Sequence, residues 1–487
     1  MGPTLVLINP WIHDFAAYDL WAKPLGLLTL AAALRRSGYR IHLIDCLDVH
    51  HPSLLEGEGT PAVKRRLYGT GKYPRLEIPK PACLSFVTRP YSRYGISPAA
   101  FQADLAAVPE PDAILVTSLM TYWYPGVQAA IAAARAVHPE APVILGGIYA
   151  RLCLRHAAAT SGADHVVYED DPRALIAFLT RFGLPPPPAA AYEHPLHPYP
   201  AFDLLHGLDY ICLLASRGCP YHCSYCAGPF LNPRTARRKA EDVLDEIRYW
   251  SREMGVVDMA FYDDALLAGP RDSIRSLLEG IAGEAPGVRF HTPNALHVRE
   301  ITRETALLLR QAGFRTIRLG LESADFSDRR MDEKVRQGEF ERAVENLLHA
   351  GFQGTEIGAY LLAGLPGQSA EAVHAALSLV EKAGVMPFIS EYSPIPHTAL
   401  WEAARAASAY DLAGEPLFHN NTLLPCWGAH ERARLPELRG KLRTIRESVR
   451  DRSAHPPHAV TAEADFRPRS EERRVGKQRR SRWSPYH

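Results

Sequence analysis

The sequence predicts an α/β protein in which an N-terminal doubly wound parallel sheet is followed by six strand–helix units that suit a partial (β/α)6 barrel. Short apolar runs alternate with segments of helical apolar spacing, which is the pattern of parallel α/β folds. A proline-rich stretch divides the chain into two parts. Polar residues gather where the apolar runs end, and the carboxyl ends of parallel strands are where such folds carry their sites.

Composition excludes several classes of protein. The chain has 487 residues, of which 47% are hydrophobic and 22% charged, and its net charge is +1. These fractions are typical of globular proteins. A net charge near zero gives no overall electrostatic attraction to nucleic acid or to anionic membranes, so we expect no nucleic-acid partner. No apolar run reaches the ~18 residues of a membrane span, and the start of the chain lacks the pattern of a signal peptide. The eight cysteines are too sparse for a disulfide framework, so we expect a cytoplasmic location.

The first domain is expected over residues 1–184, with its sheet formed by four strands, at 5–9, 39–45, 113–117 and 142–145. Ligands of such sheets bind outside the carboxyl ends of the strands, here at Asn9-Pro10, Ser118-Leu119 and Gly146-Gly147. Residues 50–108 form an insertion that is long for a loop. It could line a substrate entrance, but the favoured interpretation is a solvated excursion packed on the edge of the sheet.

A proline-rich linker is expected over 185–204 and the barrel over 205–400. The barrel strands are predicted at 210–216, 256–262, 288–294, 316–321, 355–362 and 387–392. The helices are predicted near 240–254, 273–282, 303–312, 339–350 and 371–383. Residues 401–468 form a C-terminal segment. The basic stretch 469–487 resembles a translated sequencing adapter, so we expect it to be artefactual and leave it out of the fold.

Three cysteines follow the first barrel strand at spacing C-x3-C-x2-C: Cys219, Cys223 and Cys226. Three thiolates within eight residues can serve one metal centre, but they leave an iron–sulfur cluster, which ordinarily takes four, with one iron open. The alternative is a structural zinc site. Zinc requires four ligands, usually from two separated pairs, and no second C-x2-C follows. The spacing therefore favours a cluster with an open corner.

The stretch from Ser216 to Cys226, including Tyr225 before the last cysteine, resembles the signature of the radical S-adenosylmethionine (SAM) superfamily. The resemblance implies a [4Fe-4S] cluster held by the three cysteines, SAM bound to the unique iron, and reductive cleavage of SAM to a 5'-deoxyadenosyl radical. It also implies an electron donor such as a flavodoxin or a ferredoxin.

The N-terminal domain resembles the cobalamin (B12)-binding domain that precedes many radical SAM domains. The D-x-H-x-x-G motif that carries a histidine lower ligand is absent, because residues 11–15 read Trp-Ile-His-Asp-Phe. His13 is therefore expected to be an ordinary loop histidine, and cobalamin, if it binds, to lack that ligand. Gly146 and Gly147 either admit the nucleotide tail of cobalamin or form a plain turn after a strand.

Polar residues at the carboxyl ends of the later barrel strands are candidates for binding SAM. By resemblance, Asp263 or Asp264 would face the methionine end, although the family's G-G-E motif is missing there. Glu322 and Ser323 would face the ribose or the methionine end, and Gly364 would let the backbone approach adenine. Carboxylates can take the ammonium and hydroxyl groups by charge-assisted hydrogen bonds. The alternative for each carboxylate is a helix N-cap or a surface salt bridge.

These features predict a radical SAM enzyme that cleaves SAM at a [4Fe-4S] cluster and starts radical chemistry on a substrate the sequence does not name. Cobalamin-dependent methyl transfer is one such chemistry. Two alternatives stay open: a cobalamin-independent radical SAM enzyme, and a non-catalytic iron–sulfur protein for electron transfer or sensing.

Overall fold

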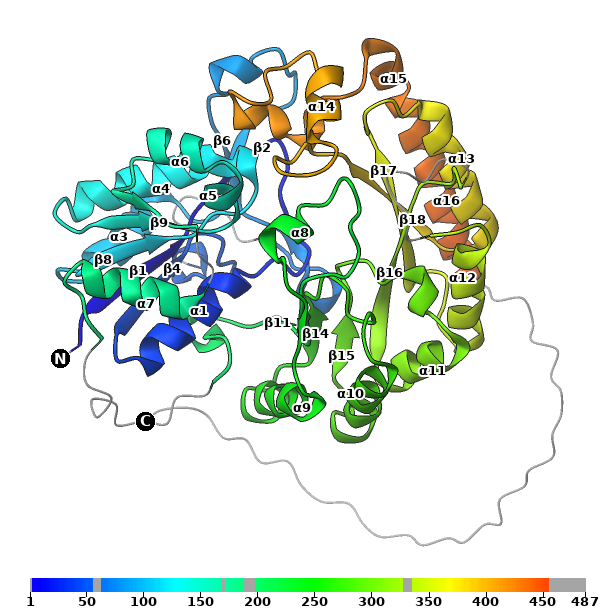
Figure 1. The fold of residues 1–487 in the computed structure, drawn as a ribbon, viewed down its shortest axis with the longest axis horizontal. Coiled ribbons are helices and arrows are strands. Elements are labelled where there is room, and N and C mark those ends of the chain that lie inside the picture. Colours follow the sequence, from blue (N-terminus) through cyan, green and yellow to red (C-terminus); the bar gives the residue numbers. More distant parts are fainter. Residues whose placement is uncertain (1, 56–62, 169–170, 187–197, 327–334, 455–487) are drawn as a thin grey trace, which may run out of the picture.

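The computed structural model describes residues 2–55, 63–168, 171–186, 198–326 and 335–454 (Figure 1). Most of the expected linker and all of the basic stretch 469–487 lie outside the described residues. Within these ranges, no helix combines the length and the apolar character needed to cross a membrane.

The N-terminal domain is built on a parallel five-stranded sheet of order β10-β9-β8-β1-β4. Its strands are β1 (Thr4–Asn9), β4 (Arg40–Asp45), β8 (Ala113–Val116), β9 (Val143–Leu145) and β10 (His165–Val166). From β1 the chain first adds β4 on one side and then returns to add the others on the opposite side, which makes the sheet doubly wound, as predicted. The fifth strand, β10, was not predicted because two residues are too short to show a pattern.

Helices cover both faces of this sheet. They are α1 (Leu25–Arg36), α3 (Pro98–Ala106), α4 (Tyr124–Val137), α5 (Ile148–Leu152), α6 (Leu154–Thr160) and α7 (Pro172–Arg181). Leu5 and Leu7 of β1 pack against α1 and α7, whereas Val6 and Ile8 pack against α3 and α4. All four side chains are fully buried, which explains why β1 reads as a continuous apolar run.

The insertion does not lie as a solvated excursion on the edge of the sheet, so the favoured interpretation was wrong. Its strand β7 (Ser92–Tyr94) pairs with β2 (Ile12–Asp14) and with β6 (Arg75–Glu77), while β5 (Gly71–Lys72) pairs with β3 (Tyr18–Asp19). The Tyr68 ring lies 4.6 Å from that of His291 in the barrel, and Arg65 pairs with Asp209 at 3.1 Å. The insertion therefore pairs with the chain after β1 through β5 and β7, and it also contacts the barrel through Tyr68 and Arg65.

The second domain is a parallel six-stranded sheet of order β11-β14-β15-β16-β17-β18, which confirms the partial barrel. Its strands are β11 (Ile211–Leu213), β14 (Asp258–Phe261), β15 (Arg289–His291), β16 (Phe314–Glu322), β17 (Ile357–Ala363) and β18 (Met386–Glu391). The outer helices are α9 (Ala240–Arg248), α10 (Arg271–Glu284), α11 (Arg303–Gln311), α12 (Glu339–His349) and α13 (Ala370–Ala383). Phe261, Phe290 and Phe314 stack across neighbouring strands in the main core, with ring centroids 5.5–5.8 Å apart.

A sixth outer helix, α16 (Leu435–Ala454), packs against α13 and β18 and completes the helical layer (Figure 1). Its buried residues Leu438, Ile445 and Val449 recur at intervals of seven and four, so one stripe of the helix faces the core.

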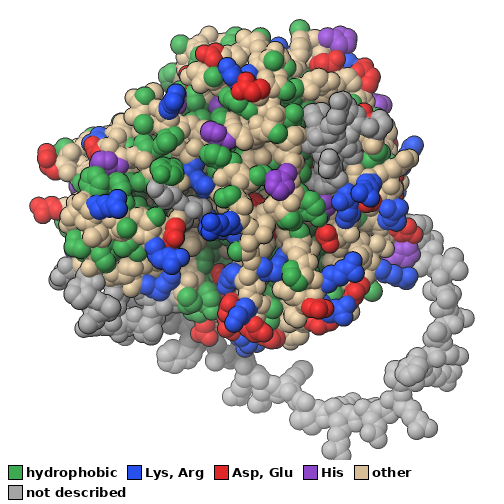
Figure 2. All heavy atoms as spheres, viewed as in Figure 1, with side chains coloured by type: hydrophobic (Ala, Val, Ile, Leu, Met, Phe, Trp, Pro, Cys, Tyr) green, Lys and Arg blue, Asp and Glu red, His purple; other side chains and the backbone are tan. Residues whose placement is uncertain are grey.

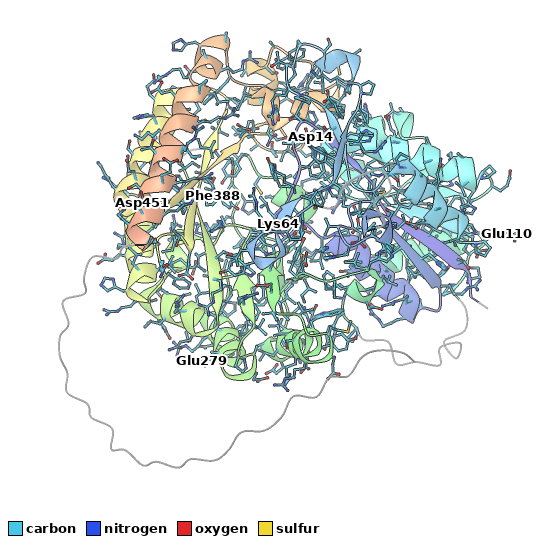
Figure 3. The ribbon with its side chains drawn as sticks, turned by 180° about the vertical axis from the view of Figure 1, so that it is seen from behind. Asp14, Lys64, Glu110, Glu279, Phe388 and Asp451 are labelled. Atoms are coloured by element: carbon cyan, nitrogen blue, oxygen red, sulfur yellow. The ribbon has the colours of Figure 1, made fainter. Side chains whose placement is uncertain are left out.

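The segment between β18 and α16 joins the two domains. It contains α14 (Trp401–Ala407) and α15 (Ala429–Ala433). Leu417 and Leu423 belong to the core of the N-terminal domain, whereas Leu412 packs with Leu365 of the barrel. The Asn420 amide donates to Asp14 at 2.7 Å. Figure 3 views the molecule from behind and places Asp14 where this segment meets the N-terminal domain.

Candidate functional site

All six barrel strands are parallel, so their carboxyl ends form one rim. The loop carrying Cys219, Cys223 and Cys226 leaves β11 at this rim and continues into the short helix α8 (Gly228–Leu231). Figure 1 places α8 between the N-terminal domain and the barrel. Arg151 of α5 donates to the Leu231 carbonyl at 2.7 Å, so the end of the cysteine loop is tied to the N-terminal domain.

The three cysteines lie near the surface, Cys219 and Cys223 half-buried and Cys226 exposed. The loop is closed at its base by the antiparallel pair β12 (Ser216–Arg217) and β13 (Ala236–Arg237). The Gly228 N–H donates to Cys226 Sγ at 3.3 Å, which holds this sulfur against the start of α8. The loop therefore presents three accessible sulfurs on a fixed base.

The donor set fits a cluster better than a single ion. Over the described ranges, no three His, Cys, Asp or Glu side chains converge as ligands of one metal ion. A closed four-ligand zinc shell is therefore not formed by these residues. In a cubane cluster each thiolate binds a different iron, so the sulfurs need not converge on one point.

Asp263 supports the base of the cysteine loop. Its carboxylate, only 3% exposed, accepts hydrogen bonds from the Ala215 N–H at 3.0 Å and from the N–H and hydroxyl of Ser216, each at 2.5 Å. Burial raises the pKa of Asp263 to about 6, and these hydrogen bonds oppose the rise. Its neighbour Asp264 is exposed and accepts from the Asn232 amide at 3.2 Å. The two carboxylates thus lie in different surroundings: Asp263 binds the backbone at the base of the cysteine loop, and Asp264 lies at the surface.

Glu322 ends β16 with a strained backbone. Its φ of 61° is unusual for a residue other than glycine, and it follows a register shift between β16 and β17. The Glu322 side chain is buried. Burial is the main cause that raises the pKa of the nearby Tyr360 hydroxyl, and the charge of Glu322 adds to the rise. Ser323 comes next, and its hydroxyl accepts from the Asp325 N–H at 3.1 Å. Strain of this kind collects at functional sites, at about 1–3 kcal/mol per residue.

The loop after β17 is held by a residue that the sequence did not single out. The Gln368 side chain accepts from the N–H groups of Gly364 and Leu365, at 2.9 and 3.2 Å, and donates to the Leu362 carbonyl at 2.9 Å. Gly364 has a φ of 99°, and a Cβ there would lie 2.8 Å from the Leu424 side chain. The glycine therefore makes room for the segment that joins the domains.

Tyr225 lies half-buried against an apolar cluster that includes Leu365, Tyr392 and Leu400. The Leu400 N–H donates to the Ser224 carbonyl at 2.9 Å. The cysteine loop is thereby attached to the segment that follows β18, a contact across some 175 residues that no local pattern reveals.

In the N-terminal domain, β1 and β8 flank the switch point of the sheet, where strands begin to be added on the other side of β1. Gly147 has a φ of 92°, and a Cβ there would lie 2.3 Å from the Ser118 carbonyl oxygen. The Ser118 hydroxyl donates to the Gly146 carbonyl at 2.6 Å. The two glycines thus form a turn packed on the end of β8. His13 lies in β2 shortly after β1, and its buried Nε2 has no hydrogen-bond partner among the residues that the structure describes. Burial and the nearby Arg93 lower the pKa of His13 to about 4.

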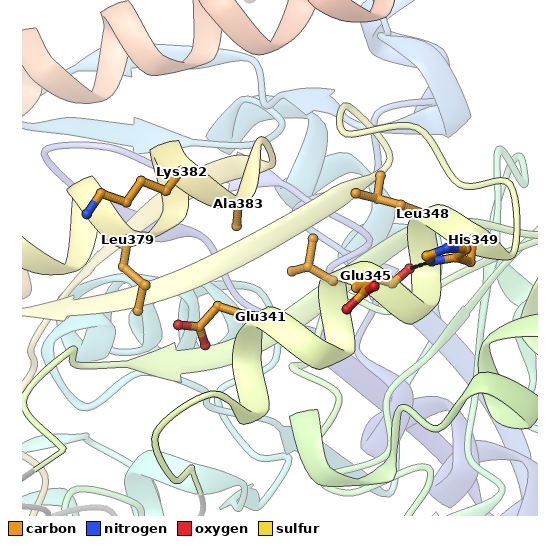
Figure 4. A pocket seen from close by; sticks show the side chains of 8 residues that line it. Glu341, Glu345, Leu348, His349, Leu379, Lys382 and Ala383 are labelled. Carbon is orange, nitrogen blue, oxygen red and sulfur yellow. Dashed lines mark hydrogen bonds between the residues drawn. The ribbon is translucent and has the colours of Figure 1, made fainter. Parts of the chain in front are cut away.

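A groove on the outer layer lies apart from these groups (Figure 4). Its lining comes from α12 and α13 and includes Glu345, Leu379 and Lys382. On the face seen in Figure 2, basic and acidic side chains are interspersed.

Comparisons with known proteins can now be placed on this geometry. Residues 213–380 match the sequence model of the Radical SAM superfamily, a stretch that contains the cysteine loop and most of the barrel. These residues form a radical SAM domain. The fold of TsrM from Kitasatospora setae, a radical SAM methyltransferase solved with cobalamin and a [4Fe-4S] cluster, matches 91% of each chain with a TM-score of 0.62 and 15% identity. The N-terminal sheet and the barrel therefore share one fold with that enzyme.

Curated relatives match over shorter stretches. An uncharacterized methyltransferase of Pyrococcus horikoshii is 23% identical over 223 residues, which cover 43% of this chain and 46% of the relative. Cytidylyl-2-hydroxyethylphosphonate methyltransferase of Streptomyces wedmorensis is 26% identical over 180 residues, covering 35% and 33%. The matched stretches span less than half the length of these relatives.

Proposed function

We propose that this radical SAM enzyme is a cobalamin-dependent methyltransferase, which cleaves SAM reductively at a [4Fe-4S] cluster held by Cys219, Cys223 and Cys226. The observation that carries the proposal is the three-cysteine loop at the rim of a radical SAM barrel, facing an N-terminal doubly wound domain in the TsrM fold. The methyltransferase names of the two curated relatives support the transfer of a methyl group.

When bound, the cluster supplies the electron that cleaves SAM, and cobalamin supplies a carrier for the methyl group. The chain's own residues bind the cluster and fix the loop that carries its ligands. The three thiolates bind the cluster, and Asp263 fixes the base of their loop through the backbone of Ala215 and Ser216. Asp263 is therefore proposed to have a structural role in addition to the SAM contact that the sequence predicted.

The remaining rim residues are proposed to bind SAM. Asp264, Glu322 and Ser323 lie at the carboxyl ends of β14 and β16 and would hydrogen-bond the ammonium or hydroxyl groups of SAM. Gly364 and the backbone held by Gln368 would lie against adenine. Tyr225 would support the loop from its apolar side, where it already packs.

Cobalamin is proposed to lie outside the carboxyl ends of β1 and β8, where ligands of such sheets bind. The buried, unbonded Nε2 of His13 lies just beyond β1 and can bond a polar group placed there. We expect no cobalt ligation by His13, because β2 fixes its backbone against β7 and the D-x-H-x-x-G pattern is absent. Gly146 and Gly147 would lie beside the nucleotide tail.

The cluster is tested by anaerobic reconstitution. We expect about four irons per chain, by analogy with cysteine-ligated cubanes, and 5'-deoxyadenosine or S-adenosylhomocysteine on addition of SAM and reductant. Alanine at Cys219, Cys223 or Cys226 should abolish the cluster, whereas alanine at Cys46, Cys83, Cys153 or Cys426 should not. A fully active zinc-loaded, iron-free protein would refute the proposal.

Cobalamin is tested separately by spectroscopy. Protein incubated with hydroxocobalamin and desalted should retain the corrinoid, and its reduced Co(II) signal should show no splitting from a nitrogen ligand. Splitting that disappears in H13A would keep the site but overturn the ligand assignment. Loss of all corrinoid from cluster-loaded protein would leave the cobalamin-independent radical SAM enzyme as the function.

A further inference from the structure

Arg318 in the middle of β16 points to an additional binding site. Along this strand Ile317, Leu319 and Leu321 are fully buried in the core shared with the outer helices. Side chains alternate along a strand, so Arg318 lies on the opposite face, toward the interior of the barrel. A guanidinium in this position needs either a counter-charge or access to a polar ligand.

The neighbouring strands are shaped around this side chain. Gly358 of β17 stands opposite Arg318 in the strand register. A Cβ at Gly358 would lie 2.9 Å from Arg318 Cδ and 2.6 Å from the Phe388 ring. The glycine therefore lets the arginine lie flat across β17, where its Cζ is 4.6 Å from the centroid of Phe388.

The Arg318 guanidinium has no carboxylate partner among the residues that the structure describes. Its Nη1 donates to the Ile317 carbonyl at 3.1 Å, and it also bonds the Tyr360 hydroxyl. These two contacts leave other N–H donors of the guanidinium without a protein acceptor. None of its nitrogens is both buried and unbonded, and the residue is only half-buried, so the remaining donors reach solvent.

The other inward arginine nearby is different. Arg289 of β15 forms a two-bond pair with Asp258, at 2.8 and 2.5 Å. The described part of the barrel thus supplies a carboxylate for Arg289 and none for Arg318.

A second cation lies beside the first. Arg446 of α16 donates to the Pro387 carbonyl at 3.0 Å, and its Cζ lies 4.7 Å from the same Phe388 ring. Burial, Arg450 and Arg318 lower the pKa of Arg446. Arg439 and Lys441 of the same helix pair with Glu391 and Glu381, whereas Arg446 has no carboxylate partner within the described ranges. Figure 3 labels Phe388 on its strand beside α16, the helix that also carries the labelled Asp451.

We propose that Arg318, supported by Arg446 across Phe388, forms an oxyanion-binding site inside the barrel that takes a carboxylate or phosphate group of the substrate. A planar guanidinium with free N–H donors matches either group through paired hydrogen bonds. The assignment of the anion to the substrate rests on the proposed function, whereas anion binding itself does not.

The test measures anion binding by the full-length protein without SAM or reductant. Thermal unfolding is followed in sodium phosphate, sodium acetate or sodium chloride at matched ionic strength and pH. A saturable rise in melting temperature is expected with phosphate or acetate over chloride, and the stronger of the two identifies the favoured group. R318Q should lose the rise, raising the apparent dissociation constant at least tenfold, while R443Q, at an exposed arginine of the same helix, should keep it. An unchanged rise in R318Q would overturn the site.

A second measurement does not depend on a variant that folds. Crystals of the wild-type protein soaked in selenate should show an anomalous selenium peak within hydrogen-bond distance of the Arg318 guanidinium. Selenate bound elsewhere but absent from Arg318 would overturn the proposal. Because neither measurement involves SAM cleavage, failure of the radical chemistry and failure of this site give separate results.

Discussion

At the scale of single residues, Asp263 and Asp264 show how position decides the role of identical side chains. Both follow β14, but only Asp263 turns inward, where it accepts three hydrogen bonds from Ala215 and Ser216, four and three residues before Cys219. A buried carboxylate accepting backbone N–H groups fixes the path of the chain more firmly than a surface contact does. The cysteine loop is therefore expected to depend on Asp263 far more than on Asp264.

Substitution tests this difference. D263A removes all three bonds and should lower the free energy of unfolding by about 2–4 kcal/mol, since bonds to charged groups are strong and their loss leaves buried donors unbonded. Iron content after reconstitution should fall with it. D264A should leave melting temperature and iron content near wild type, although it could weaken SAM binding. Equal effects of the two variants on iron content would contradict the anchoring role.

At the scale of elements, the loop after β17 depends on one side chain that bonds three backbone groups. Gln368 joins Leu362, Gly364 and Leu365 into a fixed turn at the rim. Fixed backbone reduces the entropy that a ligand must remove on binding. If this turn lies against SAM, its rigidity contributes to affinity rather than to the stability of the whole fold.

Q368A should therefore weaken SAM binding about tenfold, the equivalent of one or two neutral hydrogen bonds, with a small change in melting temperature. Isothermal titration of cluster-loaded protein gives the dissociation constant. The matched control is Q353A, which changes an exposed glutamine just before β17 and should bind SAM like wild type. Wild-type affinity in Q368A would show that the turn does not contact SAM.

At the scale of the whole molecule, the segment before α16 fixes the two domains together through a buried histidine. His419 is 1% exposed; its Nε2 bonds the Leu412 carbonyl at 2.8 Å and its Nδ1 bonds the Thr121 hydroxyl of the N-terminal domain at 2.9 Å. Burial lowers the pKa of His419 from 6.5 to about 4. The folded protein therefore holds this imidazole neutral.

The lowered pKa makes the contact between His419 and the N-terminal domain sensitive to acid. Because the folded pKa lies below the unfolded one, the stability from His419 is present above pH 6.5 and is lost as pH falls toward 4. The whole pKa shift corresponds to on the order of 3 kcal/mol in the free energy of unfolding. H419Q cannot be protonated, so the difference in melting temperature between wild type and H419Q should shrink from pH 7 to pH 5. A difference independent of pH would contradict this reading.

Sequence patterns alone were enough to predict the two parallel α/β domains, five of the six barrel helices and the three cysteines that follow the first barrel strand. Periodicity, glycine stops and C-x3-C-x2-C spacing are local, so they can be read without knowing what each segment touches. The polar groups that contact one another could be identified only from the folded chain. The backbone bonds of Asp263, the contact of the insertion with His291, the role of α16 as sixth helix and the contact of Arg318 with Phe388 all depend on partners distant in sequence. Nothing near Arg318 in the chain distinguishes it from an ordinary surface arginine; its face of β16, and the glycine opposite on β17, make it a candidate site.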